Sequence, residues 1–407
     1  MYENLSVKFE IEGVGNMKIG IVTTWFERGA AYVSKIYKEL LEKEGHQVLI
    51  FARGGDSKMS AISEIWNEKY VTRSTRYIDT TIERRKIFTW IQNNNLDAIL
   101  FNEQQDFRGV IAVKKKYPNV IIGAYVDYYT EYTRKWFDIY DFLICNTKRH
   151  VQAMGEHVQK FYIKWGTDIN LYRPKYEKHE QITFFHSVGM SIRKGTDILI
   201  DAFVDGKLYE HSKLIIHTQI PIEKNYCKYS REDLFKYNIE IIEKTVTAPG
   251  LYHKGDIYVY PTRLEGLGLT MYEALACGMP IIVTNFPPMN EFGSLDVVKY
   301  VDVGDYYCRG DAYYYPMAIC DKESLVSAMQ WFIDNKEQLN DLKLRARKYA
   351  IEHYDISDRS ADISDIFINA KTKPLNPAIV KEIKWFYLKN ENIIKKILRL
   401  RFIFEIK

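Results

Sequence analysis

Long apolar runs and paired cysteines are both missing from this chain of 407 residues. No stretch of about 18 or more apolar residues occurs, so the sequence predicts no transmembrane helix. The first residues lack the basic start and the apolar core of a signal peptide. The five cysteines are odd in number and contain no Cys-x-x-Cys pair, which favours free thiols over disulfides or a zinc site. Together these absences predict a cytoplasmic protein.

Strong charge of either sign is also lacking. The net charge of +4 is too small to predict a nucleic-acid partner. The chain contains no Walker A loop, no His-Glu-x-x-His motif and no Gly-x-Ser-x-Gly motif, which makes the chemistries that depend on them poor candidates. No Asp-x-Asp triplet follows a predicted strand, and we expect no bound metal and no other cofactor.

What is present is a regular alternation of short apolar strands and amphipathic helices. Apolar residues recur with helical spacing over 30–43, between β-rich runs at 18–23 and 46–52, and the alternation starts again at residue 182. Strands that alternate with helices form parallel sheets that are covered on both faces. The sequence therefore predicts an α/β fold of two tandem, doubly wound Rossmann-like domains, with ligands at the carboxyl ends of the strands.

The changes in pattern set the predicted boundaries. These are an appendage over 1–16, an N-terminal domain over 17–165, a linker over 166–181, a C-terminal domain over 182–360 and a tail over 361–407. From residue 380 the tail carries apolar residues among many lysines and arginines. Such a basic amphipathic helix could contact an anionic membrane surface, or it could be the last helix, crossing back to cover the N-terminal domain. The oligomeric state is not predicted.

The most informative segment is 261–280, which begins Pro-Thr-Arg-Leu-Glu-Gly-Leu-Gly-Leu. Glu265 and Glu273 are about two helical turns apart, so in a continuous helix both would project from one face. Gly266 starts a Gly-Leu-Gly-Leu turn that lies between a predicted strand over 256–260 and a predicted helix over 270–277. Because the first N–H groups of a helix are unpaired and its dipole is positive there, this arrangement predicts an anion site.

This segment resembles the glutamate-x7-glutamate motif of retaining GT-B glycosyltransferases, in particular those of glycosyltransferase family 4. The shared residues run from the leading Pro through Glu-Gly-Leu-Gly-Leu to Ala-Cys-Gly-Met-Pro. The resemblance implies two domains facing a cleft, and a sugar transferred from a nucleotide-diphosphate sugar to an acceptor hydroxyl. It implies that Glu265 binds sugar hydroxyls near the reacting carbon and that Glu273 accepts hydrogen bonds from the ribose. It also implies that the N–H groups of Leu267, Gly268 and Leu269 meet the phosphates.

A second resemblance lies over 187–197. Family 4 enzymes carry Gly-Arg, a short spacer and Lys-Gly here, and the Arg and Lys neutralise the diphosphate. Lys194 and Gly195 match the Lys-Gly pair, whereas Met190 occupies the place of the family's Arg. Arg193 is then the candidate to supply the guanidinium from a neighbouring position.

Two further candidates come from the N-terminal domain. The turn before the helix over 30–43 resembles the family's Gly-rich loop, which implies that Gly29 approaches the donor phosphate. Asp127 ends a predicted strand at the place where many members have a histidine. Its carboxylate could hold a substrate hydroxyl or assist its deprotonation, or it could cap the next element. The neighbouring Tyr128, Tyr129 and Tyr132 could stack on a sugar ring.

These resemblances lead us to expect a metal-independent retaining glycosyltransferase of hexosyltransferase type. A UDP-sugar is the favoured donor and a GDP-sugar the next, and the acceptor is a glycan or another hydroxyl compound. We expect a role in bacterial surface glycan or glycoconjugate synthesis. The departures at Met190 and Asp127 leave open a catalytically degenerate member that acts as a scaffold or partner subunit. We expect Glu265→Ala to abolish transfer and leave the fold intact.

Overall fold

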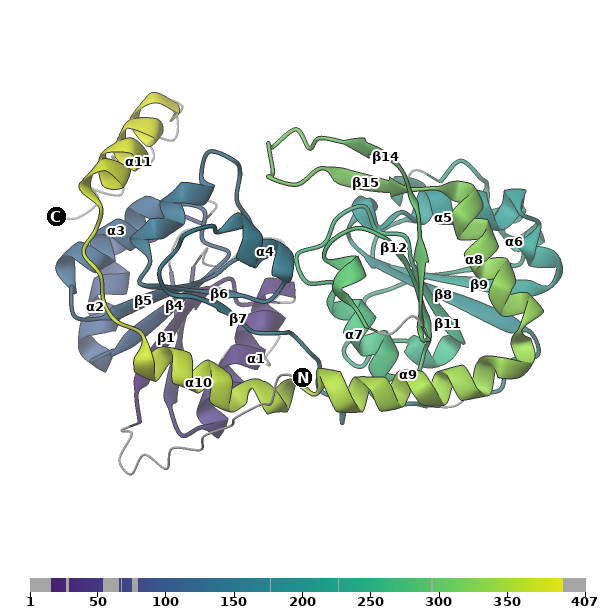
Figure 1. Cartoon of the computed structure of the whole chain (residues 1–407), viewed down its shortest axis with the longest axis horizontal. Coiled ribbons are helices and arrows are strands. Elements are labelled where there is room, and N and C mark those ends of the chain that lie inside the picture. Colours follow the sequence, from purple (N-terminus) through teal and green to yellow (C-terminus); the bar gives the residue numbers. More distant parts are fainter. Residues whose placement is uncertain are drawn as a thin grey trace, which may run out of the picture.

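Two parallel β-sheets, one in each half of the chain, organise the computed structural model (Figure 1). The structure describes residues 16–26, 29–53, 66, 68–74, 80–175, 177–225, 227–293 and 296–390. Almost all of the predicted appendage and the tail beyond residue 390 therefore lie outside the described residues.

The sheet of the N-terminal domain has the order β3-β2-β1-β4-β5-β6-β7, with all neighbours parallel. Its central strands are unbroken apolar runs, as in Ala98–Asn102, because helices cover both faces. The strands are β1 (Lys18–Thr23), β2 (Gln47–Ala52), β3 (Val71–Arg73), β4 (Ala98–Asn102), β5 (Ile121–Tyr125), β6 (Phe142–Cys145) and β7 (Lys160–Tyr162). The helices are α1 (Gly29–Lys43), α2 (Arg84–Asn94), α3 (Phe107–Lys116), the 3-10 helix η2 (Arg134–Ile139) and α4 (Lys148–Ala153).

The sheet of the C-terminal domain has the order β10-β9-β8-β11-β12-β13 and is also parallel. Its strands are β8 (Ile182–Gly189), β9 (Ser212–Thr218), β10 (Ile239–Glu243), β11 (Ile257–Tyr260), β12 (Ile281–Thr284) and β13 (Val298–Val301). Its helices are α5 (Thr196–Asp205), α6 (Arg231–Lys236), α7 (Leu269–Ala276), α8 (Lys322–Asp334) and α9 (Leu339–Tyr354). The predicted fold of two tandem Rossmann-like domains is confirmed.

An antiparallel hairpin departs from this alternation and was not predicted. It consists of β14 (Val303–Tyr307) and β15 (Met317–Cys320) and extends from the C-terminal domain toward the N-terminal one (Figure 1). The residues between its strands pair with the loop after β5, where Thr130 and Tyr313 form an isolated antiparallel bridge. The hairpin therefore forms a noncovalent contact between the two domains.

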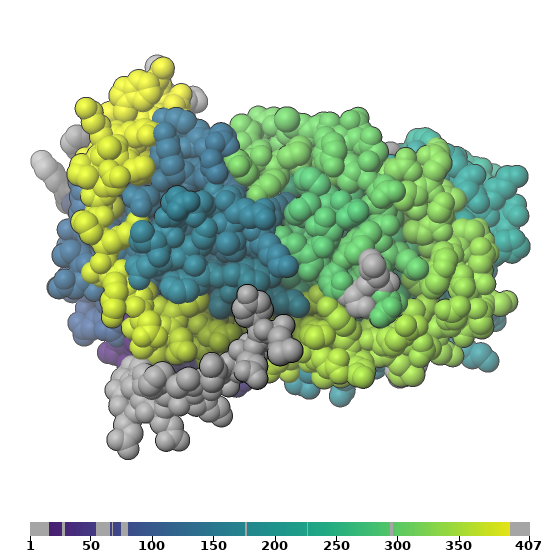
Figure 2. Space-filling model, viewed as in Figure 1, coloured from purple at the N-terminus to yellow at the C-terminus, as the bar shows by residue number. Residues whose placement is uncertain are grey.

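The chain passes between the domains twice, and the two passes lie side by side. Thr167 in the linker donates its N–H to the carbonyl of Tyr354 at 2.8 Å, and its own carbonyl accepts from the N–H of Ile356 at 3.1 Å. After this second pass, α10 (Ser360–Asn369) packs on α1, and Nε2 of His46 lies 2.7 Å from the hydroxyl of Ser364. Figure 2 shows the returning chain, in yellow, running over the N-terminal domain.

The last described helix, α11 (Pro377–Asn390), packs on α3 and η2 of the N-terminal domain. Ile383 is fully buried there, and Phe386 lies with its ring 5.0 Å from the ring of Trp136. The indole N–H of Trp136 donates to the carboxylate of Glu382 at 3.0 Å. Among the residues that the structure describes, no helix combines the length and the apolar character needed to cross a membrane.

Candidate functional site

Glu265 lies in the loop between β11 and α7, ahead of the helix rather than within it. α7 begins at Leu269, after Gly268, whose φ of +74° is left-handed and ends any helical continuity with Glu265. Glu265 and Glu273 therefore do not lie on one face of a continuous helix. The sequence placed them on one face only if the segment were a single helix. Glu265 is 5% exposed and its backbone follows the end of a buried strand, so the carboxylate is held at the carboxyl edge of the sheet.

Four donors converge on one oxygen of the Glu265 carboxylate. Oε1 accepts from Nζ of Lys194 at 2.7 Å, from the guanidinium of Arg193 at 3.2 Å, from the hydroxyl of Thr262 at 2.7 Å and from the hydroxyl of Tyr260 at 2.9 Å. Burial alone would raise the pKa of Glu265, but the two cations and the hydrogen bonds outweigh burial and lower the pKa to about 2. The carboxylate is therefore charged at neutral pH, although it is buried.

The two cations come from a short 3-10 turn, η3 (Ile192–Lys194), between β8 and α5. Burial lowers the pKa of Lys194 to about 8, and the charge of Glu265 opposes that shift. Gly195 has a φ of +77°, and a Cβ added to it would lie 2.1 Å from the carbonyl oxygen of Pro261. Only glycine lets this turn pack so closely on the loop that carries Glu265. The predicted residues Arg193, Lys194 and Glu265 are thus brought together.

Glu273 lies in α7 and is half-buried. Its Oε2 accepts from the hydroxyl of Tyr252 at 2.5 Å. Burial raises the pKa of Glu273, whereas hydrogen bonds from Tyr252 and Tyr172 and the charge of Lys194 oppose the rise. Glu273 therefore accepts hydrogen bonds from tyrosine hydroxyls and lies close enough to Lys194 for that positive charge to act on its pKa.

The start of α7 holds the remaining predicted donor-binding residues. Gly268 is the N-cap residue, and glycine has no side chain with which to cap the helix. The N–H of Met271 donates to the carbonyl of Gly268 at 2.9 Å, so the N–H groups of Leu269 and Thr270 are the ones left to a ligand or to water. The side chain of Leu267 is buried in the core and anchors the loop.

Asp127 reaches the same place from the N-terminal domain. A Cβ added to Gly266 would lie 2.0 Å from Oδ1 of Asp127, so the Asp127 carboxyl group packs directly on the glycine backbone. Burial, the nearby charge of Glu103 and a hydrogen bond with Glu103 raise the pKa of Asp127, against the opposing charges of Arg149 and Arg193. Asp127 thus faces the C-terminal domain and joins the Glu265 cluster.

Glu103 directly follows β4 and has a φ of +50°, a conformation that is rare outside glycine and common at functional sites. Other polar residues near these strand ends have structural roles. Asn102 donates to the carbonyl of Ala30 at 2.8 Å, and Asp106 caps α3 by accepting from the N–H of Arg108.

Gly29 is not tied to this cluster by the described residues. It is the first residue of α1, and among the described residues no atom lies within 4 Å of a Cβ added to it. Residues 27 and 28 of the predicted Gly-rich loop lie outside the described part of the chain. The role of Gly29 stays a prediction.

The tyrosines after β5 are placed differently from one another. Tyr128 lies with its ring 5.3 Å from that of Tyr313 in the hairpin, whereas Tyr129 is buried in the core. Tyr132 packs on Trp136 at 5.2 Å between ring centres. Tyr129 also contacts the hairpin tip, with its ring 6.0 Å from that of Tyr313, but it is buried, so Tyr128 is the one beside the tip that stays partly exposed.

Arg149 was missed from the sequence. It is the second residue of α4 in the N-terminal domain, is 2% exposed and donates to the backbone carbonyl of Glu265. Its sequence surroundings, Lys-Arg-His, carry no recognisable motif, and its partners are more than 100 positions away in the chain. Within the described residues, no group of three or more His, Cys, Asp or Glu side chains is arranged to hold a metal ion.

Two facing parallel α/β domains, with cations and a carboxylate where their strand ends meet, define the GT-B class of fold. Residues 168–349 match the model of the family described as glycosyl transferases group 1. The chain is similar to a glycosyltransferase from Rickettsia africae, with a TM-score of 0.69 and 13% identity over 88% of this chain and 100% of that one. It is also similar to HepE from Anabaena, solved with UDP and glucose, with a TM-score of 0.67 and 15% identity over 87% of this chain and all of that one. The resemblance of the sequence to GT-B glycosyltransferases is confirmed.

A curated relative matches a shorter part of the chain. An uncharacterized glycosyltransferase of Sulfolobus islandicus rod-shaped virus 1 is 27% identical over 110 residues. The match covers 26% of this chain and about a third (33%) of the viral protein.

Proposed function

We propose that the protein is a glycosyltransferase that moves a sugar from a nucleotide-diphosphate sugar to an acceptor hydroxyl, with retention at the anomeric carbon. The convergence of Arg193, Lys194 and Glu265 just ahead of α7 carries the proposal. Such a donor needs positive charge at its phosphates and a hydrogen-bond acceptor at its sugar. Two adjoining loops of this chain, the η3 turn and the loop before α7, together offer both. A UDP-linked donor is favoured, because HepE is solved with UDP, and a GDP-linked donor is next.

The donor would lie along the start of α7. Its diphosphate would be held by Arg193 and Lys194 and by the N–H groups of the Gly266–Leu269 turn, which supply positive charge without a metal ion. Glu265, charged and turned toward the same place, would accept hydrogen bonds from the sugar. Glu273 would accept from the ribose. We therefore propose a metal-independent reaction.

The acceptor would approach from the N-terminal domain, where Asp127 faces Gly266. A carboxyl group with a raised pKa exchanges a proton more readily near neutral pH than an ordinary aspartate does. Asp127 would hold the acceptor hydroxyl while the leaving phosphate takes its proton. The identity of the acceptor, a role in bacterial surface glycan synthesis and a cytoplasmic location remain predictions.

Thermal unfolding with UDP, GDP, ADP and dTDP, each with EDTA and with magnesium, tests the donor site. A nucleotide at about a hundred times its dissociation constant adds roughly 2.7 kcal/mol to the free energy of unfolding. We expect UDP to raise the midpoint equally with EDTA and with magnesium. A shift that requires magnesium would contradict metal independence, and a shift from GDP alone would replace the favoured donor.

The second candidate function is a catalytically degenerate scaffold or partner subunit, which Met190 in place of the family's Arg favours. Arg193 lies beside Lys194 and against Glu265, so the positive charge that Met190 lacks is present from a neighbouring residue. The absence of any nucleotide-induced shift would favour the scaffold over the enzyme.

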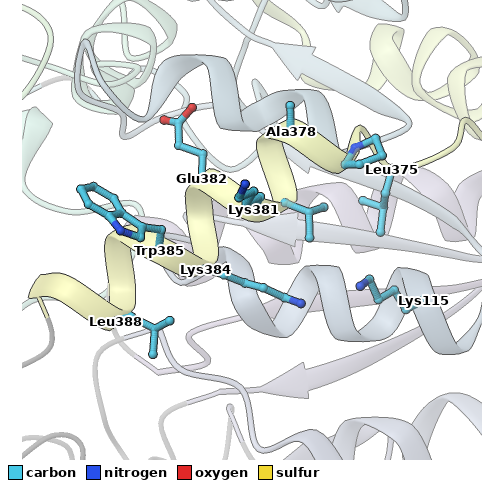
Figure 3. Close-up of a pocket in the computed structure, with 10 residues that line it drawn as sticks. Lys115, Leu375, Ala378, Lys381, Glu382, Lys384, Trp385 and Leu388 are labelled. Carbon is cyan, nitrogen blue, oxygen red and sulfur yellow. The ribbon is translucent and has the colours of Figure 1, made fainter.

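We also propose that the outer face of α11 contacts an anionic lipid surface. Val380 and Ile383 are buried on the inner face of α11. Trp385 and Leu388 on its outer face are 57% and 67% exposed. They border a groove of about 810 Å³ that is also lined by Lys115, Lys381 and Lys384 (Figure 3). A tryptophan and a leucine among lysines form the pattern of a helix that lies at the interface of an anionic membrane.

Sedimentation with lipid vesicles tests this contact. We expect the protein to bind vesicles that contain phosphatidylglycerol more tightly than vesicles of phosphatidylcholine alone, and Trp385→Ser with Leu388→Ser to weaken that binding at least about threefold. Leu344→Ser is the matched control, because Leu344 is 62% exposed on α9 of the other domain. Equal binding by the double variant and the control would contradict the proposal.

A further inference from the structure

Arg149 belongs to the N-terminal domain, but its side chain is bonded to the C-terminal domain. Its guanidinium donates to the carbonyl of Pro287 at 2.8 Å and to the carbonyl of Glu265. A third contact, at 3.4 Å, reaches the hydroxyl of Tyr313 in the hairpin. Because Arg149 is 2% exposed, its charge is buried, and backbone carbonyls of the opposite domain accept its hydrogen bonds.

The C-terminal domain returns the contact through Glu291. Its carboxylate accepts from the backbone N–H of Lys148 at 2.6 Å and of Arg149 at 2.9 Å, where α4 begins. The N-terminus of a helix attracts a negative charge, so Glu291 serves as a cap supplied from the other domain. Arg149 and Glu291 thus each satisfy backbone groups of the opposite domain.

The hairpin tip completes the junction. The hydroxyl of Tyr313 donates to the carbonyl of Asp127 at 3.2 Å, and the hydroxyl of Tyr315 donates to the carbonyl of Arg149 at 2.9 Å. The guanidinium of Arg149 also lies 4.5 Å from the ring centre of Tyr315. The residue that faces the proposed acceptor, Asp127, and the residue that reaches the proposed donor loop are therefore held by the same hairpin.

We propose that Arg149 is a positioning residue that fixes the Glu265 loop only when the two domains are closed. Arg149, Glu291 and Tyr313 form what we call the interdomain clamp. The Glu265 carbonyl that Arg149 holds directly precedes Gly266 and the start of α7, so opening of the domains would release the loop that the proposed donor binds. The effect on transfer rests on the proposed function, whereas the effect on the loop does not.

The consequence is a separation of binding from turnover. Three of the proposed nucleotide contacts, Arg193, Lys194 and Glu273, lie within the C-terminal domain and are not held by the clamp, whereas the N–H groups of the Gly266–Leu269 turn are held by it. Transfer needs, in addition, Glu265 and Asp127 in register across the domain boundary. Loss of Arg149 should therefore slow the chemical step much more than it weakens nucleotide binding. Loss of a residue that only stabilised the fold would not slow the chemical step selectively in this way.

Arg149→Lys is the test variant, because lysine keeps the charge but lacks the fork that reaches two carbonyls. Arg347→Lys is the matched control, since Arg347 also donates to backbone carbonyls, those of Tyr172, Ala276 and Ile169, away from the clamp. We expect Arg149→Lys to lower kcat about 10- to 100-fold while the dissociation constant of UDP rises no more than about threefold. A UDP affinity that falls in step with kcat would overturn the positioning role.

Hydrogen–deuterium exchange gives a readout without activity. The N–H of Met271 is bonded to the carbonyl of Gly268 at 2.9 Å, and the amides that follow it are bonded within α7. Amide exchange over 271–275 should be at least about tenfold faster in Arg149→Lys and in Glu291→Gln than in Arg347→Lys, with β8 and β9 unchanged. The Arg149→Lys and Glu291→Gln effects should be less than additive in the double variant. Unchanged exchange over 271–275 in both variants would refute the clamp even if the wild-type protein transfers sugar. Faster exchange in the variants, combined with a wild-type protein that has no transferase activity, would leave the clamp standing and refute the proposed function.

Discussion

Glu265→Gln will lower kcat/KM for sugar transfer about 10²- to 10³-fold, measured as the initial rate of nucleotide release from the donor that the thermal shift identifies. Gln keeps the size of the side chain but removes the charge that is opposed to Arg193 and Lys194. It also replaces the charged acceptor for the sugar hydroxyls by a weaker neutral one. Both changes act where the proposed reaction develops charge.

The matched control is Glu240→Gln, which removes a carboxylate paired with Lys213 at 2.6 Å on the surface of the same domain. We expect it to leave kcat/KM unchanged. A Glu265→Gln variant with the turnover of the control would remove Glu265 from the site.

Glu265→Ala is a less informative variant than the sequence suggests. A carboxylate at the end of a loop carries little packing, which is why the sequence predicts an intact fold. In the structure, however, the carboxylate is buried and is the shared counter-charge of Arg193 and Lys194. Removing it leaves two cations with no carboxylate between them, so we expect Ala to cost stability as well as activity.

The parts of the fold that the sequence predicts well are those whose cause is local. β1 is an apolar run with β-branched residues, and the structure has it at the predicted residues Lys18–Thr23. The strand, turn and helix around Glu265 follow in the predicted order, because Gly266 and Gly268 mark the turn. The sequence could also suggest that Arg193 and Lys194 lie near Glu265, since parallel strands place successive strand ends at one edge.

What the sequence could not predict depends on contacts between distant segments. The hairpin that carries Tyr313 has no strong alternation of apolar and polar residues, and four of the five β14 residues are exposed. Its position is set by pairing with Thr130 across the domain boundary, which no local pattern encodes. Arg149 is an ordinary charged residue in the sequence, and only the closed arrangement of the domains gives it its neighbours. The sequence could therefore predict the residues of the candidate donor site, but not the contacts that join them to the acceptor side.

Asp141→Ala will lower the free energy of unfolding of the N-terminal domain by about 3–5 kcal/mol, the usual cost of leaving one partner of a buried ion pair alone. Asp141 is fully buried and accepts from Nζ of Lys114 at 2.5 Å, from the N–H of Ile122 at 2.8 Å and from the N–H of Lys373 at 2.7 Å. It therefore joins a helix, a strand and the returning chain ahead of α11.

Urea denaturation followed by tryptophan fluorescence measures this loss, because five of the seven tryptophans lie between residues 25 and 165. Asp205→Ala is the control, since Asp205 pairs with Lys322 at the surface and should change the midpoint little. Adding Lys114→Met to Asp141→Ala removes the unpaired charge and should recover part of the loss. Equal midpoints for Asp141→Ala and Asp205→Ala would show that the pair does not hold the returning chain in place. A large loss that Lys114→Met relieves would identify the stranded ammonium group, buried after the loss of its carboxylate, as the cause.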